Sequence, residues 1–315
     1  MKTKILLIGK NGQLGNDLQN LLPRLGALVA TNREQLDLSR PADIRSLIQD
    51  FRPALIVNAA AYTAVDQAEK DEPLARAINS VAPAVIAEAA KKIGAALVHY
   101  STDYVFDGSK NSPYEENDPP NPLSAYGRTK LAGEQAIRDS GVDHLIFRTA
   151  WVYSTRGKNF LLTILRLATQ REELRIVRDQ IGAPTWSREI ASASAQVLQQ
   201  IYNQSDARAA WSEHGGTYHL TAAGETNWYE SAQAILQEAA HAPDSLAWFR
   251  AATNGKELLA RRVLPITTAE YPTPARRPAY SVLSNSKLNR AFGIQLPGWR
   301  QQLQLAFSLN SPHTP

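Results

Sequence analysis

Tyr126 and Lys130 lie four residues apart in the segment SAYGRTK, a spacing that stacks two side chains on one face of a helix. A phenol is a poor acid at neutral pH because its pKa is near ~10, and a neighbouring ammonium lowers that pKa by favouring the phenolate. Such a tyrosine can exchange a proton with a carbonyl or an alcohol. The pair alone is weak evidence, since solvated surface helices also contain it.

A glycine-rich segment follows the first apolar run of the chain. Residues 4–8 have the composition of a buried parallel strand and lead into GKNGQLG at residues 9–15. Leucines at helical spacing follow, which predicts a helix directly after the glycines. Free N–H groups at a helix N-terminus attract a pyrophosphate, so the segment predicts a dinucleotide site.

The three glycines have separate roles in this interpretation. Gly9 forms the tight turn, Gly12 lets the phosphates approach the backbone, and Gly15 lets the helix pack closely on the strand. The G-x-x-G-x-x-G spacing is a variant of the usual fingerprint, and an ordinary tight turn is the alternative. The glycines and the Tyr126 to Lys130 spacing together favour a dinucleotide-dependent enzyme.

Short apolar runs alternate with helical segments through the first half of the chain and beyond. The runs occupy residues 27–30, 55–58, 96–101, 145–148, 175–177 and 218–220. This alternation predicts an α/β protein with a Rossmann-type doubly wound parallel sheet, in which ligands bind beyond the carboxyl ends of the strands. The polar segments at 9–15, 58–61 and 101–103 each follow such a run.

The regular alternation stops near Thr149, after which proline-containing loops appear at 179–185 and 271–278. A chain of 315 residues suits a nucleotide domain of about 150 residues with a smaller companion. We therefore expect a dinucleotide-binding domain at 1–148, to which later strands near 174–178 and 217–221 return. Residues 149–315 are expected to form mainly a smaller C-terminal substrate-binding domain.

Composition excludes several classes of protein. The absence of cysteine excludes disulfides, thiol nucleophiles and cysteine-built metal sites. No apolar run approaches the ~20 residues of a membrane span. The net charge of +4 comes without a Lys/Arg stripe interleaved with aromatic residues, so an anionic cofactor and substrate explain it better than nucleic acid does. We expect a cytoplasmic protein with no membrane or nucleic-acid partner.

Several strings in the same order resemble the extended short-chain dehydrogenase/reductases over nearly the whole chain. They are GKNGQLG (9–15), VNAAAYTAVD (57–66), HYSTDYVFDG (99–108), FRTAWVY (147–153) and the loop at 271–278. Within that family the resemblance is to the enzymes that reduce the C4 ketone of dTDP-4-dehydro-6-deoxy-L-mannose to dTDP-L-rhamnose. It implies a Rossmann-type reductase that uses NADPH or NADH and binds a dTDP-sugar.

The resemblance also implies roles for individual residues. Tyr126 is the proton donor, Lys130 lowers its pKa and holds the nicotinamide ribose, and the Thr102 hydroxyl bonds the substrate oxygen. Asp103 and Trp151 contact the sugar. Simpler alternatives are that Thr102 only ends its strand and that Trp151 only packs in the core.

The cofactor site implied by the resemblance comprises Gly9, Asn11, Gly12, Gln13 and Leu14 at the pyrophosphate, Asp37 and Leu38 at the adenine, and Ala61, Tyr62 and Thr63 beside the ribose and nicotinamide, with Tyr126 and Lys130. An acid after the second strand would repel a 2′-phosphate. This chain has Asn32 and Arg33 there, so NADPH is expected to be preferred over NADH.

Some relatives form a dimer around Mg²⁺ held by glutamates, and the matching positions here are Asp17, Arg188 and Leu309. Only Asp17 can ligate Mg²⁺, which requires oxygen ligands, unless a shift of one residue brings in Glu189. We therefore expect no metal site, and a monomer or a weak homodimer.

Two alternatives remain. Another nucleotide-sugar enzyme of the same family, a 4-ketoreductase, a 4-epimerase or a 4,6-dehydratase, shares the fold, the Tyr/Lys pair and the cofactor. The dehydratase needs a second acid after the catalytic threonine, whereas Asp103 is followed here by Tyr104. A non-catalytic, dinucleotide-binding regulatory subunit is the other alternative, and the intact Thr102, Tyr126 and Lys130 argue against it.

Overall fold

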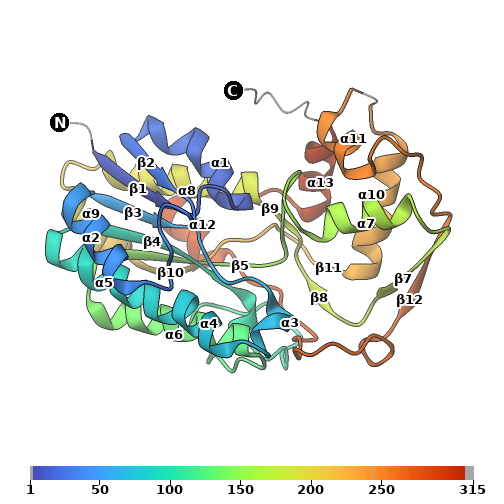
Figure 1. The fold of residues 1–315 in the computed structure, drawn as a ribbon, viewed down its shortest axis with the longest axis horizontal. Helices are drawn as coiled ribbons and strands as arrows, with labels where there is room; N and C mark the ends of the chain where they lie inside the picture. Colours follow the sequence, from blue (N-terminus) through green and yellow to red (C-terminus); the bar gives the residue numbers. More distant parts are fainter. Residues whose placement is uncertain (1–2, 244, 309–315) are drawn as a thin grey trace.

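The computed structural model describes residues 3–243 and 245–308, which form a larger body built on a parallel sheet and a smaller body beside it (Figure 1). The sheet order is β2-β1-β3-β4-β5-β10, and every neighbouring pair is parallel. Its strands are β1 (Lys4–Ile8), β2 (Ala27–Thr31), β3 (Leu55–Asn58), β4 (Ala96–Thr102), β5 (His144–Thr149) and β10 (Gly216–His219).

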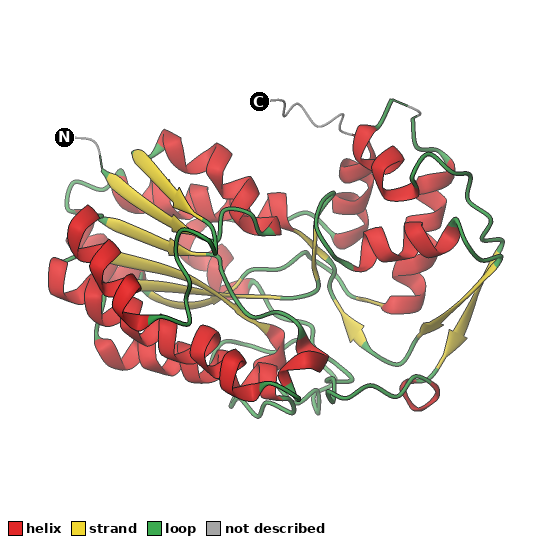
Figure 2. Cartoon of the chain, viewed as in Figure 1, coloured by secondary structure: helices red, strands yellow, loops and turns green. Residues whose placement is uncertain are grey.

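Helices cover both faces of this sheet (Figure 2). One face carries α1 (Gln13–Leu21), α8 (Ser187–Tyr202), α9 (Ala207–His214) and α12 (Ser286–Phe292); the other carries α2 (Pro41–Phe51), α5 (Ala82–Ile93) and α6 (Ala125–Ser140). Alternate strand residues enter the two cores, as Leu7 does on the first face and Leu6 on the second. Because both faces are buried, the strands read as continuous apolar runs.

The strand order changes direction at β1. The chain leaves β1 for β2 on one side and then returns to β3 on the other, so the carboxyl ends of β1 and β3 flank a switch point. Ligands of open α/β sheets bind at such a point. The predicted Rossmann-type doubly wound fold is confirmed, and both the glycine segment at 9–15 and the segment at 58–61 lie at this edge.

The smaller body is mainly helical. It contains α7 (Phe160–Ala168), α10 (Trp228–Ala240), α11 (Ala247–Thr253) and α13 (Trp299–Ser308), with the short strand pairs β6 (Val152–Tyr153) with β9 (Thr185–Trp186), β8 (Ile181–Gly182) with β11 (Thr226–Asn227), and β7 (Glu173–Val177) with β12 (Arg262–Ile266). No helix within residues 3–243 and 245–308 has both the length and the apolar character to cross a bilayer.

One expected strand does not return to the main sheet. The strand near 174–178 is β7, which pairs with β12 in the smaller body. Leu174 is buried but Arg175 is exposed, and a strand inside a sheet covered on both faces must be apolar on both. The strand near 217–221 is β10, which does pair with β5. Helices α8, α9 and α12, which come after residue 148, also pack on the main sheet. The domain boundary at residue 148 remains a prediction.

Candidate active site

Thr102 and Tyr126 meet at the carboxyl edge of the sheet. Thr102 ends β4, and Tyr126 lies in the first turn of α6, where the Ser124 side chain accepts a hydrogen bond from the Gly127 N–H at 3.2 Å. A Cβ on Gly127 would lie 2.2 Å from the Tyr104 carbonyl oxygen, so only glycine lets the helix approach so closely. The Thr102 hydroxyl lies close enough to the Tyr126 phenol to affect its pKa.

The surroundings of Tyr126 shift the pKa of its phenol. Burial raises this pKa to about 12, the interaction with the Thr102 hydroxyl opposes the shift, and the charge of Asp103 adds to it. The Lys130 Nζ donates to the Tyr100 carbonyl oxygen at 2.6 Å, so its side chain reaches inward onto β4, and its effect on the Tyr126 phenol stays a prediction.

Lys130 lies in a buried polar chain. Its Nζ is 3.2 Å from Nε2 of His99, and Nδ1 of His99 is 3.2 Å from Nδ2 of Asn58. All three residues are only 1% exposed. Burial lowers the pKa of Lys130 to about 8 and is opposed by the Glu134 carboxylate. Lys130 can therefore lose its proton near neutral pH, which an exposed lysine does not.

Asp103 follows Thr102 directly and is almost fully buried. Its Oδ1 accepts a hydrogen bond from the Thr102 hydroxyl at 3.0 Å, while Oδ2 has no partner among the described residues. Burial raises the pKa of Asp103 to about 6, and the nearby Ser281 and Thr102 hydroxyls oppose the shift. An unpaired buried oxygen beside the Thr102 to Tyr126 pair is suited to accept a hydroxyl from a bound sugar.

The glycines predicted to bind a dinucleotide are placed where side chains have little or no room. Gly9 has φ +94°, and a Cβ there would lie 2.8 Å from the Ala60 nitrogen. A Cβ on Gly15 would lie 2.1 Å from the Gly9 carbonyl oxygen. The fold itself thus demands these two glycines. Gly12 has negative φ, and its nearest obstacle is at 3.3 Å, so its missing side chain leaves space for a phosphate at the start of α1.

The neighbours of Gly12 are placed differently from one another. Asn11 is exposed, and Leu14 is buried in the core, which leaves only its backbone for the cofactor. The Gln13 Oε1 accepts a hydrogen bond from Nδ2 of Asn159 at 2.7 Å. Because Asn159 caps α7, this bond joins the predicted phosphate site to the smaller body.

The residues predicted at the adenosine end of the cofactor follow β2. Asn32 exchanges two 3.1 Å hydrogen bonds with Gln35, and Arg33 is exposed. Hydrogen bonds from Ser39, and more weakly the charge of Arg33, lower the pKa of Asp37. Leu38, the other predicted adenine contact, is buried.

The segment after β3 is held from behind by Asn79. The Tyr62 N–H donates to Asn79 Oδ1 at 2.8 Å, and Asn79 Nδ2 donates to the Tyr62 carbonyl oxygen at 3.0 Å. Asn79 lies in η2, a π-helical turn (Ala77–Val81) after α3 (Val65–Ala68) and α4 (Glu72–Arg76). This brace leaves Ala61, Tyr62 and Thr63 partly or fully exposed at the sheet edge.

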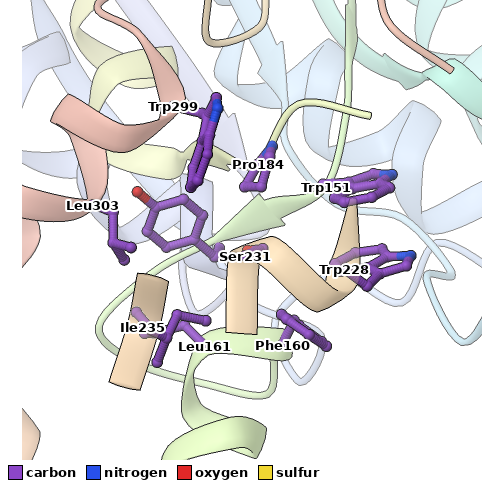
Figure 3. Close-up of a pocket in the computed structure, with 10 residues that line it drawn as sticks. Trp151, Phe160, Leu161, Pro184, Trp228, Ser231, Ile235, Trp299 and Leu303 are labelled. Atoms are coloured by element: carbon purple, nitrogen blue, oxygen red, sulfur yellow. The ribbon is translucent and has the colours of Figure 1, made fainter. Parts of the chain in front are cut away.

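Trp151 follows β5 and packs against an aromatic residue of the smaller body. It has φ +46°, unusual for a bulky residue, and its ring stacks on Trp228 at 3.4 Å with an interplanar angle of 5° (Figure 3). A Cβ on Gly182 would lie 2.4 Å from the ring, so glycine makes room for it. Strained backbone of this kind is typical of functional sites. The apolar cavity beside the stack holds about 20 Å³, enough for one or two waters and too small for a sugar.

The loop at 271–278 and the three positions matched to a metal site were also singled out by the sequence. Arg277 pairs with Asp66 at 2.7 Å, which anchors the loop at 271–278 to α3. Asp17 accepts a hydrogen bond from the Ser187 hydroxyl at 2.5 Å, and the Arg188 guanidinium lies over the Trp186 ring. Leu309 lies outside the described residues. Within 3–243 and 245–308 no group of three acidic, histidine or cysteine side chains forms a metal cluster.

Comparison with known proteins identifies the family. A family model described as RmlD substrate binding domain matches residues 3–310. A protein of Burkholderia thailandensis named dTDP-4-dehydrorhamnose reductase is 49% identical over 302 residues, which cover 96% of this chain and 97% of that protein. The chain belongs to the dTDP-4-dehydrorhamnose reductase family. The resemblance inferred from the sequence is confirmed.

Other members of the dTDP-4-dehydrorhamnose reductase family are also similar to this chain over nearly its whole length. The Escherichia coli K12 protein of that name is 42% identical, with 94% of both chains covered. A Bacillus anthracis dTDP-4-dehydrorhamnose reductase solved in complex with NADP is 34% identical, has a TM-score of 0.83, and the match covers 98% of this chain and 99% of that one. A Thermus thermophilus UDP-glucose 4-epimerase, 19% identical with a TM-score of 0.75 over 99% of this chain and all of that one, shares the fold alone.

Sequence reasoning missed the groups that hold the predicted residues in place. Asn58 and His99 belong to the family strings at 57–66 and 99–108, but no role was predicted for them. The signal that could have revealed them is a polar residue within an otherwise apolar strand. Trp228 and Asn159 gave no such signal, because their partners Trp151 and Gln13 are distant in the sequence.

Proposed function

We propose that this protein reduces the C4 ketone of dTDP-4-dehydro-6-deoxy-L-mannose to dTDP-L-rhamnose, with NADPH as the preferred donor and NADH as a poorer one. The observation that carries the proposal is the Thr102 to Tyr126 pair at the edge of the sheet where the glycine segment ends. It occurs in a chain whose relatives at 42% to 49% identity are named dTDP-4-dehydrorhamnose reductases.

NADPH, when bound, supplies the hydride that reduces the sugar ketone. The residues that we assign to it are Gly9, Asn11, Gly12, Gln13 and Leu14 at the pyrophosphate, Asn32 and Arg33 at the 2′-phosphate, Asp37 and Leu38 at the adenine, and Ala61, Tyr62, Thr63 and Lys130 at the ribose and nicotinamide. The space at Gly12 and the exposed cation of Arg33 support this assignment.

The protein's own side chains supply the proton that the ketone oxygen takes up. As the ketone oxygen gains negative charge, the Tyr126 hydroxyl donates its proton to that oxygen, and Thr102 donates a hydrogen bond. The Lys130 ammonium, one helical turn away, stabilises the phenolate that remains. We assign Asp103 and Trp151 to the sugar, Asp103 because of its unpaired oxygen and Trp151 because of its strained backbone.

We further propose that the protein works in the cytoplasm, without a nucleic-acid or membrane partner, as a monomer or a weak homodimer without Mg²⁺. The engagement of Asp17 by Ser187 and the cation at Arg188 support the absence of a metal bridge.

The test is to add the dTDP-4-keto sugar and NADPH to the purified protein and follow the nicotinamide absorbance. We expect NADPH oxidation with formation of dTDP-L-rhamnose, identified by NMR. A 4-epimerase would interconvert sugars with retained NAD and no net oxidation. A protein that binds NADPH but never oxidises it would support the regulatory alternative and refute the proposal.

A further inference from the structure

The buried chain formed by Asn58, His99 and Lys130 connects three elements beneath the active site. It runs from the end of β3 through the middle of β4 to α6, with 3.2 Å at each of its two contacts. Nothing in the proposed reaction requires a histidine here. Burying three polar side chains without water is costly unless each hydrogen bond is matched, so the matching of donors and acceptors carries information.

The hydrogen-bond donors and acceptors of Asn58, His99 and Lys130 do not match if Lys130 is an ammonium. Asn58 Oδ1 accepts the Ala60 N–H at 3.2 Å, which directs Nδ2, a donor, at Nδ1 of His99. Burial and the charge of Lys130 keep the pKa of His99 well below its usual value, so the ring is neutral and has one acceptor nitrogen. If Nδ1 accepts from Asn58, Nε2 carries the hydrogen and Lys130 must accept it as an amine.

We propose that His99, oriented by Asn58, is a positioning residue that holds Lys130 in place and makes its ammonium proton easy to release. Protonation of Lys130 forces the His99 hydrogen from Nε2 to Nδ1, where it faces the amide donor of Asn58. Relief requires the amide to turn, which breaks its bond to the Ala60 N–H. The network therefore stabilises the amine relative to the ammonium.

The other charged groups near Lys130 do not cancel the preference of this network for the neutral amine. On its own helix, Glu134 favours the ammonium, but its carboxylate is already paired with Arg148 at 2.8 Å and Arg138 at 3.1 Å. On the β4 side, Asp103 bonds Thr102.

The inference rests on the proposed function, because it predicts a pH profile for ketone reduction. Tyr126, with a pKa raised by burial, keeps its proton through the range in which Lys130 titrates. Below that range Lys130 is an ammonium and stabilises the Tyr126 phenolate; above it the charge is absent and kcat falls. The alkaline limb of the profile thus reports the Lys130 proton.

Two variants should move the alkaline limb to higher pH. His99→Gln offers Lys130 a carbonyl acceptor, and Asn58→Asp offers Nδ1–H an acceptor while keeping the Ala60 bond, so both favour the ammonium. We expect each to raise the midpoint by about one pH unit, a tenfold change in the acid constant of Lys130. The matched control is His144→Gln, because His144 begins β5, away from the network, and its imidazole contacts the Val142 carbonyl oxygen.

Nitrogen NMR of the histidine rings tests the same claim without turnover. At about pH 9, above the limb, wild-type His99 should be the neutral Nε2–H tautomer, assigned as the signal missing from His99→Gln. An Nδ1–H tautomer or an imidazolium at that pH overturns the inference, as does an unmoved or lowered limb in folded variants that bind NADPH. If wild type fails to reduce the sugar, the proposed function fails, and the NMR result still decides the role of His99.

Discussion

The two bodies hold their functional side chains in different ways. In the larger body, Thr102 and Tyr126 lie on a strand and a helix fixed by the parallel ladder, and buried hydrogen bonds hold Lys130. In the smaller body, Trp151 has a left-handed backbone and is held by stacking on Trp228. A proton donor must be placed within fractions of an ångström, whereas an aromatic wall tolerates movement. We infer that the chemistry belongs to the first region, and that the second region adds an aromatic contact to the sugar that is separate from the chemistry.

The largest effect should follow removal of the proton donor. Tyr126→Phe keeps the ring but loses the acidic hydroxyl, so kcat should fall by about 10²-fold or more. NADPH affinity, measured by fluorescence titration, should hardly change. The control is Tyr153→Phe, which removes a buried hydroxyl that has no partner within the described chain. Near wild-type turnover by Tyr126→Phe would exclude Tyr126 as the acid.

Loss of the aromatic stack should affect substrate binding more than chemistry. Trp228→Ala removes the surface that holds Trp151 in its strained conformation, so KM for the sugar nucleotide should rise by about tenfold, with kcat within about threefold of wild type. Trp228→Phe retains a ring and should lie between the two. Steady-state kinetics at saturating NADPH give both constants. A large fall in kcat with unchanged KM would show that the two regions are not separate.

A smaller effect is expected at the edge of the larger body. Arg33→Ala should reduce kcat/KM for NADPH by about tenfold, because a cation near the 2′-phosphate is lost, and should leave NADH almost unaffected. NADH serves as the internal control for folding. Wild-type protein that prefers NADH would contradict the role of Arg33.

The smallest effect concerns metal. EDTA treatment should change neither activity nor sedimentation, because Arg188 repels a cation where glutamate would be needed. Activity lost to EDTA and restored specifically by Mg²⁺ would contradict the prediction.

The sequence was most informative where structure is local. The strand at 55–58 and the glycine segment were predicted from their own residues, since apolar runs and helix starts are encoded locally. The pairing of β7 with β12, and not with the main sheet, depends on a partner about 90 residues away in the sequence. Hydrophobic periodicity does not reveal such a partner. The direction of the Lys130 side chain was missed for the same reason, because His99 and the Tyr100 carbonyl lie on another element.

The division of labour between the two regions is tested most directly by the double variant Tyr126→Phe/Trp228→Ala. If one region supplies the proton and the other binds the sugar, their free-energy effects add. The loss in kcat/KM should then equal the product of the two single losses within about twofold. A double variant that loses far less than this product would mean that Tyr126 and Trp228 act as one unit, and would contradict the account.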